Sequence, residues 1–221
     1  MIMTRNYVAI ANKYVSNVLS GKVDASKHVI EACQRQKNDL AKWKSKSSPF
    51  VFNKERAELV CEFIEALPHI KGPLAGTPIV LEPWQIFILT TTFGWLTQAG
   101  YRRFRRVYIE VPRGNGKSAL SSALGLFMMA ADKEGGAECY SFATTRDQAK
   151  IVFNDAKMMA KKSPRFLRRC GIDVQAHVIL KMDNASKFEA QSAEGSTLDG
   201  LNTHFACVDE LHAHRTRSVY D

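Results

Sequence analysis

The sequence has no apolar run long enough to cross a membrane. Its longest largely apolar stretch, residues 119–131, is far shorter than the ~20 residues that a spanning helix needs. It also lacks the apolar core of a secretory signal peptide, because Arg5 and Lys13 interrupt residues 1–21. These two absences predict a soluble, intracellular protein with no membrane partner.

Cysteine is scarce and forms no recognisable pattern. The five cysteines are an odd number, are widely spread and include no C-x-x-C pair; they are Cys33, Cys61, Cys139, Cys170 and Cys207. This excludes a disulfide framework and a cysteine zinc site, and it favours a reducing compartment. We expect the cysteines to be small buried hydrophobic residues, most clearly Cys207, which lies inside an apolar run.

Acidic residues are fewer than basic ones. The 221 residues include 31 Lys and Arg against 22 Asp and Glu, which gives a net charge of +9. Such an excess favours a polyanionic partner, and nucleic acid before a membrane surface. A hydrophobic content of 45% excludes intrinsic disorder, and the length fits one large domain or one domain with an appendage.

The first hundred residues are patterned as helices. Apolar residues recur every three or four positions in residues 7–18, and a more polar, lysine-rich helix is expected over residues 24–43. Asn53 is a favourable N-cap for a third helix, and Pro83 can occupy the first turn of a fourth. Glycines and prolines interrupt residues 68–78, which we therefore expect to be a connector.

After Gly100 the pattern changes to alternating strands and helices. Strands are expected at residues 107–111, 137–143, 178–180, 187–190 and 203–208, and helices at residues 117–131 and 146–162, the second of them capped by Thr145. Strands that alternate with helices of this length predict an α/β sheet that is largely parallel and has right-handed crossovers. We expect the domain boundary near Tyr101.

The strongest chemical signal is the segment VPRGNGKS at residues 111–118. It follows an expected strand and opens an expected helix, which is the context of a phosphate-binding loop. Gly114 and Gly116 allow successive backbone N–H groups to turn toward phosphate oxygens, and the helix N-terminus adds partial positive charge. Lys117 can reach the β- and γ-phosphates, and the Ser118 hydroxyl can ligate Mg²⁺.

This loop departs from the usual G-x-x-x-x-G-K-[ST] pattern, because Val111 stands where the first glycine is expected. The alternative interpretation is a glycine-rich turn between strand and helix that contains a lysine by chance. The expected strand and helix on its two sides favour the phosphate-binding loop.

A second signal is the acidic pair Asp209-Glu210, which follows the expected apolar strand at residues 203–208. Ligands of α/β sheets bind beyond the carboxyl ends of strands. An aspartate there can hold the Mg²⁺ shell, and the adjacent glutamate can polarise an attacking water. The alternative is an acidic helix N-terminus beside a strand.

Together the loop and the acidic pair resemble the Walker A and Walker B motifs of the ATPase domain of phage terminase large subunits. These proteins typically carry a basic residue inside the loop, here Arg113. The segment LEPWQ at residues 81–85 resembles their adenine-reading motif, with Gln85 as the reader. The segments ATTRDQA at 143–149 and DELHAH at 209–214 are similar to other parts of the family.

The resemblance implies a P-loop NTPase fold of the additional-strand, RecA-like kind, with a mostly parallel sheet flanked by helices. Residues 1–100 would be a helical N-terminal region that includes the adenine-binding motif, and residues 101–221 an ATPase core that is incomplete at its C-terminal end. The cofactors would be ATP and Mg²⁺. The residues expected to bind the nucleotide are Gln85, Arg113, Gly114, Asn115, Gly116, Lys117 and Ser118; Ser118 and Asp209 would hold the metal, and Glu210, Lys117 and Arg113 would be catalytic.

The resemblance also implies the partners of a DNA-packaging motor. These are double-stranded DNA, the portal protein of the procapsid, the small terminase subunit and other copies of the chain in a ring. The motor would act in the host cell cytoplasm and dock transiently on the procapsid.

Two features depart from the family pattern. Leu198-Asp199-Gly200 lacks the arginine that many terminases insert into a neighbouring site, so the charge would come from Arg113, Arg146, Arg215 or Arg217. The nuclease domain of the family is not expected in this chain, because no cluster of carboxylates for two metals follows Glu210 before Asp221.

Other functions stay open on the sequence alone. A helicase-like ATPase outside packaging would share the loop and the acidic pair, and a binding-only module would share the loop. For the basic run at residues 102–106 the alternatives are DNA phosphates, a subunit interface or a solvated turn. The alternatives for a second cluster are DNA phosphates or solvated surface; it consists of Lys161, Lys162, Arg165, Arg168 and Arg169. His212 and His214 are expected at a polar helix start rather than in a metal site.

Overall fold

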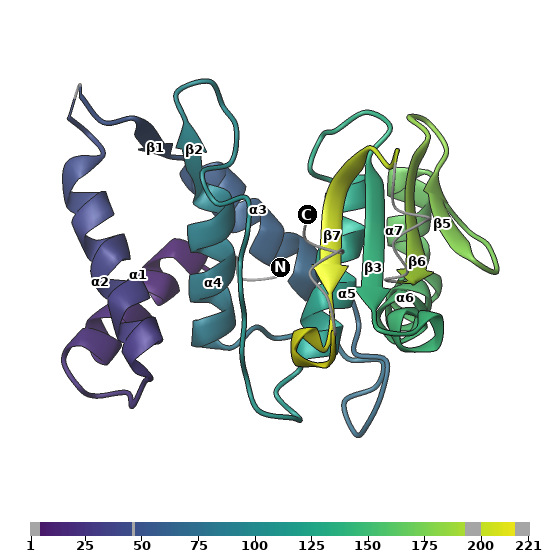
Figure 1. The fold of residues 1–221 in the computed structure, drawn as a ribbon, viewed down its shortest axis with the longest axis horizontal. Helices are drawn as coiled ribbons and strands as arrows, with labels where there is room; N and C mark the ends of the chain where they lie inside the picture. Colours follow the sequence, from purple (N-terminus) through teal and green to yellow (C-terminus); the bar gives the residue numbers. More distant parts are fainter. Residues whose placement is uncertain (1–4, 46, 193–199, 215–221) are drawn as a thin grey trace. The chain divides into compact units, whose positions relative to one another are not determined.

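The computed structural model describes residues 5–45, 47–192 and 200–214 (Figure 1). The chain forms two compact units. The first unit comprises Met1–Glu65 and Val80–Glu110, and the second comprises Ala66–Ile79 and Val111–Asp221. None of the described helices is both long and apolar enough to cross a membrane.

The first unit is mainly helical, as the apolar periodicity predicts. Its helices are α1 (Tyr7–Leu19), α2 (Lys27–Lys42), α3 (Lys54–Glu65) and α4 (Pro83–Gly94). Two predicted features of the helix starts are confirmed: the Asn53 side chain accepts a hydrogen bond from Arg56 N at 2.8 Å, and Pro83 lies in the first turn of α4. The antiparallel pair β1 (Phe50–Phe52) and β2 (Trp95–Thr97) was not predicted.

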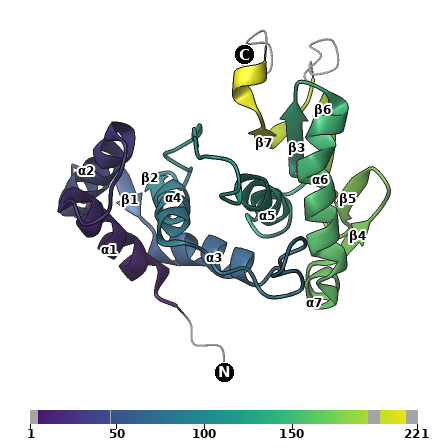
Figure 2. The same cartoon turned by 90° about the horizontal axis from the view of Figure 1, so that it is seen from below.

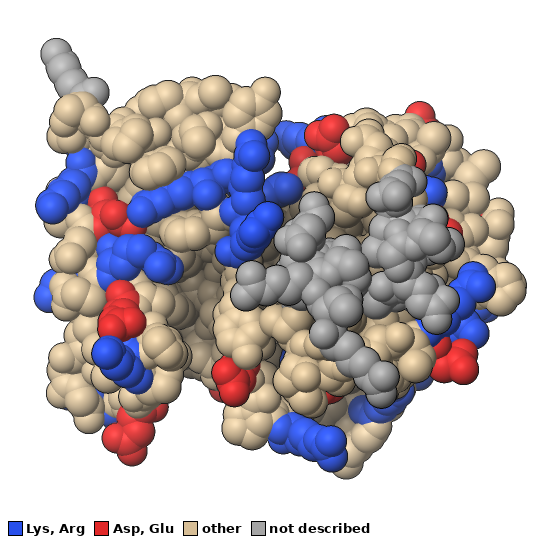
Figure 3. Space-filling view, in the orientation of Figure 1, with Lys and Arg blue, Asp and Glu red and all other residues tan. Residues whose placement is uncertain are grey.

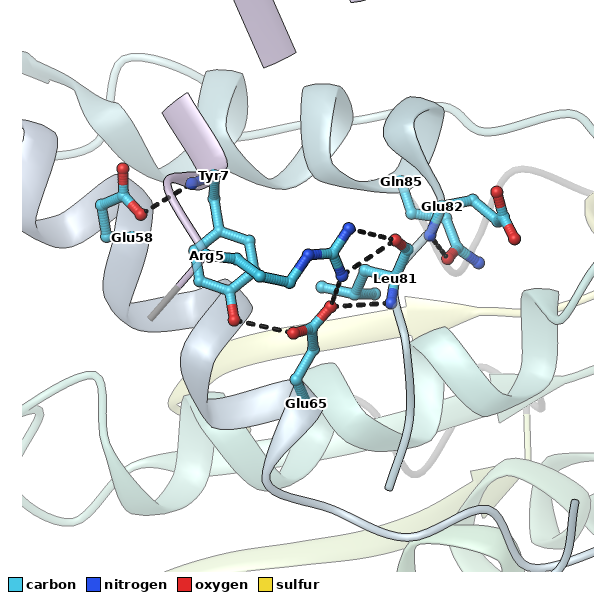
Figure 4. Close-up of polar contacts among 7 residues, drawn as sticks. All are labelled: Arg5, Tyr7, Glu58, Glu65, Leu81, Glu82 and Gln85. Carbon is cyan, nitrogen blue, oxygen red and sulfur yellow. Dashed lines mark hydrogen bonds and ion pairs between the residues drawn. The ribbon is translucent and has the colours of Figure 1, made fainter. Parts of the chain in front are cut away.

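Glu65 joins three parts of the first unit (Figure 4). Its carboxylate forms an ion pair with Arg5, accepts a hydrogen bond from the Tyr7 hydroxyl at 2.8 Å and accepts another from Leu81 N at 2.9 Å. Burial and the Glu65 carboxylate both raise the pKa of Tyr7, so its hydroxyl stays protonated and can donate. One carboxylate at the end of α3 therefore fixes the start of α1 and the segment that enters α4.

The basic run at residues 102–106 lies in the first unit, where Lys and Arg side chains gather near β1 and β2 on the face shown in Figure 3. The Arg103 guanidinium stacks 4.3 Å from the ring centroid of Phe50 and forms an ion pair with Asp39 at 2.7 Å. Arg103 is therefore a packing residue, which none of the three interpretations of this run anticipated. Arg105 and Arg106 are exposed.

The second unit is a five-stranded sheet with helices. Its elements are α5 (Lys117–Ala130), β3 (Glu138–Ala143), α6 (Arg146–Lys161), α7 (Pro164–Cys170), β4 (Ile172–Val174), β5 (Val178–Lys181), β6 (Ser186–Ser192), β7 (Thr203–Val208) and the 3₁₀ turn η2 (Leu211–Ala213). The strand order is β4-β5-β6-β3-β7. The predicted alternation of strands and helices is thus present, and the fold is a mixed α/β fold.

The sheet is mixed, which corrects the prediction of a largely parallel one. β3 is parallel to both β6 and β7, as predicted, but β5 is antiparallel to both β4 and β6. The cause is the length of the connections, because residues 175–177 and 182–185 join their strands as hairpins. A parallel pair needs a crossover of a dozen or more residues, which neither connection provides.

The predicted strand at residues 107–111 is wrong. These residues lead into the loop without strand structure, and the side chains of Val107 and Tyr108 are exposed. Their β-branched and aromatic composition favours an extended backbone, but a strand also needs a hydrogen-bonding neighbour. In the part of the chain that the structure describes, no strand pairs with this segment.

The core of the second unit lies between the sheet and the helices α5 and α6, which occupy the same side of the strands (Figures 1 and 2). Phe188 of β6 contacts both helices: its ring lies 6.0 Å from that of Phe153 on α6, and it faces Gly125 on α5. The Ser122 hydroxyl of α5 donates to Val152 O of α6 at 2.8 Å. These contacts hold α5, and with it the end of the loop, in place on the sheet.

Gly125 provides the first testable prediction. A Cβ at this position would lie 2.5 Å from the ring of Phe188, which is fully buried and packs on Phe153. Overpacking of about 1–3 kcal/mol exceeds the ~1 kcal/mol that alanine gains over glycine in a helix, so we expect Gly125→Ala to lower the free energy of unfolding. Urea denaturation measures this change. In the Phe188→Leu background the same substitution should become neutral or stabilising, and equal effects in the two backgrounds would contradict the packing argument.

The predicted connector is confirmed over residues 68–78. Pro68 and Pro78 form an isolated bridge at its base, and Ile79 N donates to Leu67 O at 2.9 Å. Lys71 forms an ion pair with Asp155 of α6 at 2.5 Å, and the Asp155 side chain is only 10% exposed. The connector is thus tied to the second unit, although the residues on both sides of it belong to the first.

Candidate nucleotide-binding site

The loop before α5 has the backbone that its glycines predict. Gly114 and Gly116 have φ values of 85° and 74°, in the left-handed region that glycine adopts without strain. Nothing lies within 4 Å of the position of a Cβ on Gly114, so its backbone conformation, and not lack of space, requires glycine. The Asn115 side chain closes the loop by donating to Pro112 O at 3.1 Å.

The acidic pair extends the ladder between β7 and β3. Asp209 N donates to Phe142 O at 2.8 Å, so Asp209 lies at the carboxyl end of two parallel strands. Glu210 has φ 48° and ψ 49°, a left-handed conformation that is rare for a residue with a side chain. Its N–H donates to Asp209 Oδ1 at 3.0 Å. This sharp turn directs the two neighbouring carboxylates to one side.

The structure brings the loop and the acidic pair together at Lys117. Its Nζ lies 3.1 Å from Asp209 Oδ1 and 3.1 Å from Glu210 Oε1. Partial burial lowers the pKa of Lys117, but the hydrogen bonds and charges of the two carboxylates outweigh this effect and raise it above the ordinary value. Lys117 is therefore a firmly protonated cation that faces two anions.

The three charged groups are accessible to a ligand. The side chains of Lys117 and Glu210 are 35% and 40% exposed, whereas that of Asp209 is 13% exposed. Arg113 and Asn115 are exposed, and Ser118 is half-buried at the first turn of α5. An open loop with free glycine backbone, next to a lysine and two carboxylates, can hold a phosphate chain and a hard cation together.

The chemistry of the possible metal ligands fits magnesium. The described residues contain no group of three or more His, Cys, Asp or Glu that could hold a metal ion, so a closed zinc-type site is absent from them. Mg²⁺ is instead bound through one or two protein oxygens together with waters and substrate phosphates. The Ser118 hydroxyl and the Asp209 carboxylate supply oxygens of this kind.

The comparison with known proteins decides the family. Residues 83–221, more than half of the chain, match the model of the family described as "Terminase large subunit, ATPase domain". This chain belongs to that family.

The large terminase of one phage agrees with this membership both in sequence and in structure. Over 157 residues the chain is 29% identical to the terminase large subunit of Enterobacteria phage HK97, and the match covers 70% of this chain and 30% of the relative. The crystal structure of the HK97 bacteriophage large terminase matches with a TM-score of 0.58 and 25% identity, over 69% of this chain and 30% of that one. The chain therefore spans about 30% of the length of these terminases.

Within this terminase ATPase domain, His214 makes a contact with Asp209 that the sequence did not reveal. Its Nε2 lies 3.2 Å from Asp209 O, and because a carbonyl oxygen only accepts, Nε2 must carry the proton. His214 thus fastens the η2 turn to the residue that would hold the metal. His212 is exposed, with Nδ1 3.5 Å from Glu210 Oε2. The spacing of the two histidines in the sequence did not indicate that His214 bonds to Asp209 while His212 is exposed.

The other predicted site residues make no contact with Lys117, Asp209 or Glu210 among the described interactions. Gln85 lies in the first unit, where its Oε1 accepts a hydrogen bond from Glu82 N at 2.9 Å in the capping box of α4 (Figure 4); its adenine role stays a prediction. Thr145 caps α6 as predicted, since its hydroxyl accepts from Gln148 N at 3.3 Å. Arg146 is exposed in the first turn of α6. Leu198, Asp199, Arg215 and Arg217 lie outside the described residues.

Burial of the cysteines follows the prediction only in part. Cys33, Cys61 and Cys139 are buried, whereas Cys170 and Cys207 are half-buried. Cys207 is less covered than its apolar run suggested because β7 is an edge strand of the described sheet.

Proposed function

We propose that this chain is the ATP-hydrolysing part of a phage DNA-packaging motor, which couples ATP hydrolysis to the movement of double-stranded DNA into procapsids. The observation that carries the proposal is the convergence of Lys117 on Asp209 and Glu210, at 3.1 Å each, in a chain of the terminase family. This arrangement supports the P-loop NTPase fold of the additional-strand, RecA-like kind, whose parallel part would include β6, β3 and β7.

The loop would bind the triphosphate of ATP. The backbone N–H groups of Gly114, Asn115 and Gly116 would face its oxygens, and the Lys117 ammonium would reach the β- and γ-phosphates. Arg113, exposed inside the loop, would add a cation beside the transferred phosphoryl group. Gln85 would read the adenine. Ser118 and Asp209 would hold Mg²⁺, which would supply positive charge against that of the phosphates.

Glu210 would act on water. Its carboxylate accepts a proton from the water that attacks the γ-phosphorus, while the bond to the bridging oxygen of the departing ADP breaks. In the structure Lys117 neutralises part of the charge of Asp209 and Glu210. When Lys117 turns to the phosphates, it frees Asp209 for the metal and Glu210 for the water. Binding of the substrate therefore assembles the catalytic arrangement.

The proposal also specifies the partners of the motor. We infer that the motor works as a ring of copies of this chain on the portal protein, receives its DNA from a small terminase subunit and acts in the host cell cytoplasm. The domain boundary near Tyr101 remains part of the proposal. We propose no nuclease function for residues 1–221.

Measurements of turnover test the proposed function. We expect the purified chain to hydrolyse ATP with Mg²⁺, to be stimulated by procapsids or by portal protein, and not to unwind duplex DNA. Unwinding of a duplex with a single-stranded tail would support a helicase-like ATPase instead. ATP binding without turnover under all these conditions would support a binding-only module. A mock preparation from cells that do not express the chain, purified in the same way, measures the background of contaminating ATPases.

A further inference from the structure

The second unit carries an exposed cluster of cations at the end of α6 and along α7. We call this cluster the basic surface; it consists of Lys161, Lys162, Arg165, Arg168 and Arg169, and all five are exposed. No carboxylate of the described residues forms an ion pair with any of them. Elsewhere in the second unit five lysines are paired, namely Lys71 with Asp155, Lys117 with Asp209 and Glu210, Lys150 with Asp147, Lys181 with Asp183, and Lys187 with Glu189. The other described cations of this unit, Arg113, Lys133, Arg146 and Lys157, form no ion pair with a described carboxylate, but they are scattered along the sequence. The basic surface differs from these single cations because its five cations lie within residues 161–169.

Stability of the fold does not explain these charges. α7 has seven residues, and none of them is buried. Arg165 precedes Arg168 and Arg169 by three and four positions, spacings at which like charges on a helix repel each other. Arg168 and Arg169 lie in the last turn, where the helix dipole favours cations, but Arg165 lies near the first turn, where it does not. An external anion would relieve this repulsion.

The basic surface is richer in cations than in the apolar side chains of a protein interface. Interface cores are depleted of charge and enriched in large apolar and aromatic side chains. The exposed large hydrophobic side chains nearest to it in the sequence are Met158 on α6 and Met182 after β5, and none lies between these two residues. Phosphate contacts need only cations and carry no sequence information, which suits a protein that must move along DNA of any sequence.

α6 connects the basic surface to the candidate nucleotide site. It begins after Thr145 at the end of β3, the strand whose carboxyl end lies beside Asp209, and Figure 2 shows it running to α7. A helix of 16 residues is about 24 Å long. Val152, Phe153, Ala156 and Met159 are almost fully buried along its length, so α6 is held firmly between the two places.

We propose that the basic surface binds the sugar–phosphate backbone of duplex DNA, independently of its sequence. This inference rests on the proposed function, and it deepens it by assigning the DNA contact to α7 and the end of α6. Movement at the start of α6 during hydrolysis would then reach the DNA through one packed helix.

The test compares two variants of equal charge in the full chain. The first replaces three arginines of the basic surface (Arg165→Gln, Arg168→Gln, Arg169→Gln). The control replaces three exposed lysines of the first unit (Lys13→Gln, Lys22→Gln, Lys37→Gln). Binding of a random-sequence duplex is measured over a salt series. Each phosphate contact contributes about 0.9 to the slope of log K against log salt, so we expect the first variant to lose about 2.7 of that slope and the control to lose almost none.

Additional measurements separate loss of DNA binding from loss of folding and from binding of another partner. Circular dichroism confirms folding, and a variant with Lys at all three arginine positions should retain most of the binding because it retains the charge. If both glutamine variants bind as the unmodified chain does, or weaken equally, the basic surface is not the DNA contact, while the proposed function stands. If the unmodified chain binds no duplex, the packaging function itself fails. Binding of poly-glutamate is measured for the same variants. If the first variant loses poly-glutamate binding but keeps duplex binding, the basic surface binds an acidic protein and the proposal is overturned.

Discussion

Glu210→Gln is expected to retain ATP binding and to lower ATP turnover by about 10²–10⁴-fold, the usual contribution of a positioned general base. The amide has the size of the carboxylate but cannot take a proton from water. Lys117 keeps its partner Asp209 at 3.1 Å, so the loop keeps its position. The strain of a left-handed backbone at φ 48° is similar for Gln and Glu, so the turn is retained as well. Binding of a fluorescent ATP analogue and steady-state phosphate release measure the two effects.

Glu189→Gln is the matched control for this substitution. Glu189 is also a carboxylate paired with a lysine, Lys187 at 2.9 Å, but it lies on β6, two strands from β7. The same chemical change there should leave turnover close to that of the unmodified chain. Unchanged turnover in Glu210→Gln would remove this glutamate from the mechanism.

Lys117→Ala is expected to weaken both ATP binding and turnover. Hydrogen bonds to a charged group are worth about 1.5–3 kcal/mol, which corresponds to a loss of about 10- to 150-fold in affinity. The loss of affinity should lie toward the upper end of this range. Without Lys117, which now pairs with both Asp209 and Glu210, these two carboxylates would repel the phosphates. Alanine is a strong helix former, so α5 should still begin at this residue.

Isothermal titration with ATP measures this loss directly. Lys150→Ala serves as the control, since it also removes a paired lysine, here from Asp147 on α6, and should not change affinity. Loss of the metal-binding carboxylate in Asp209→Asn should lower the dependence of ATP affinity on Mg²⁺, which separates the roles of the two residues. Full ATP affinity in Lys117→Ala would mean that this loop does not bind the phosphates.

The sequence was most informative where local chemistry determines the structure. The apolar spacing of α1, the Asn53 and Thr145 caps and the first-turn Pro83 follow from interactions within a few residues, and all are present. The meeting of Lys117 with Asp209 and Glu210 matches the expected site, but not for the expected reason. No strand precedes the loop in the described chain, and the loop is positioned by α5, which packs on the sheet.

Long-range pairing was less predictable. Residues 107–111 have the composition of a strand but no strand neighbour in the described chain. The short β1 and β2 are paired across more than forty residues, and β5 is reversed because its connections are hairpins. The roles of Arg103 and His214 depend on partners that only the fold supplies, an aromatic ring from β1 and a carbonyl beside β7. No local pattern encodes these partners.

The connector has a practical consequence for dividing the protein. The chain passes between the two units three times, after Glu65, after Ile79 and after Glu110. A fragment beginning at the expected boundary near Tyr101 would therefore omit Ala66–Ile79, and Asp155 would lose its partner Lys71. An uncompensated carboxylate that is largely removed from water is strongly destabilising. A fragment that holds the whole second unit must therefore include both Ala66–Ile79 and Val111–Asp221, for example joined by circular permutation.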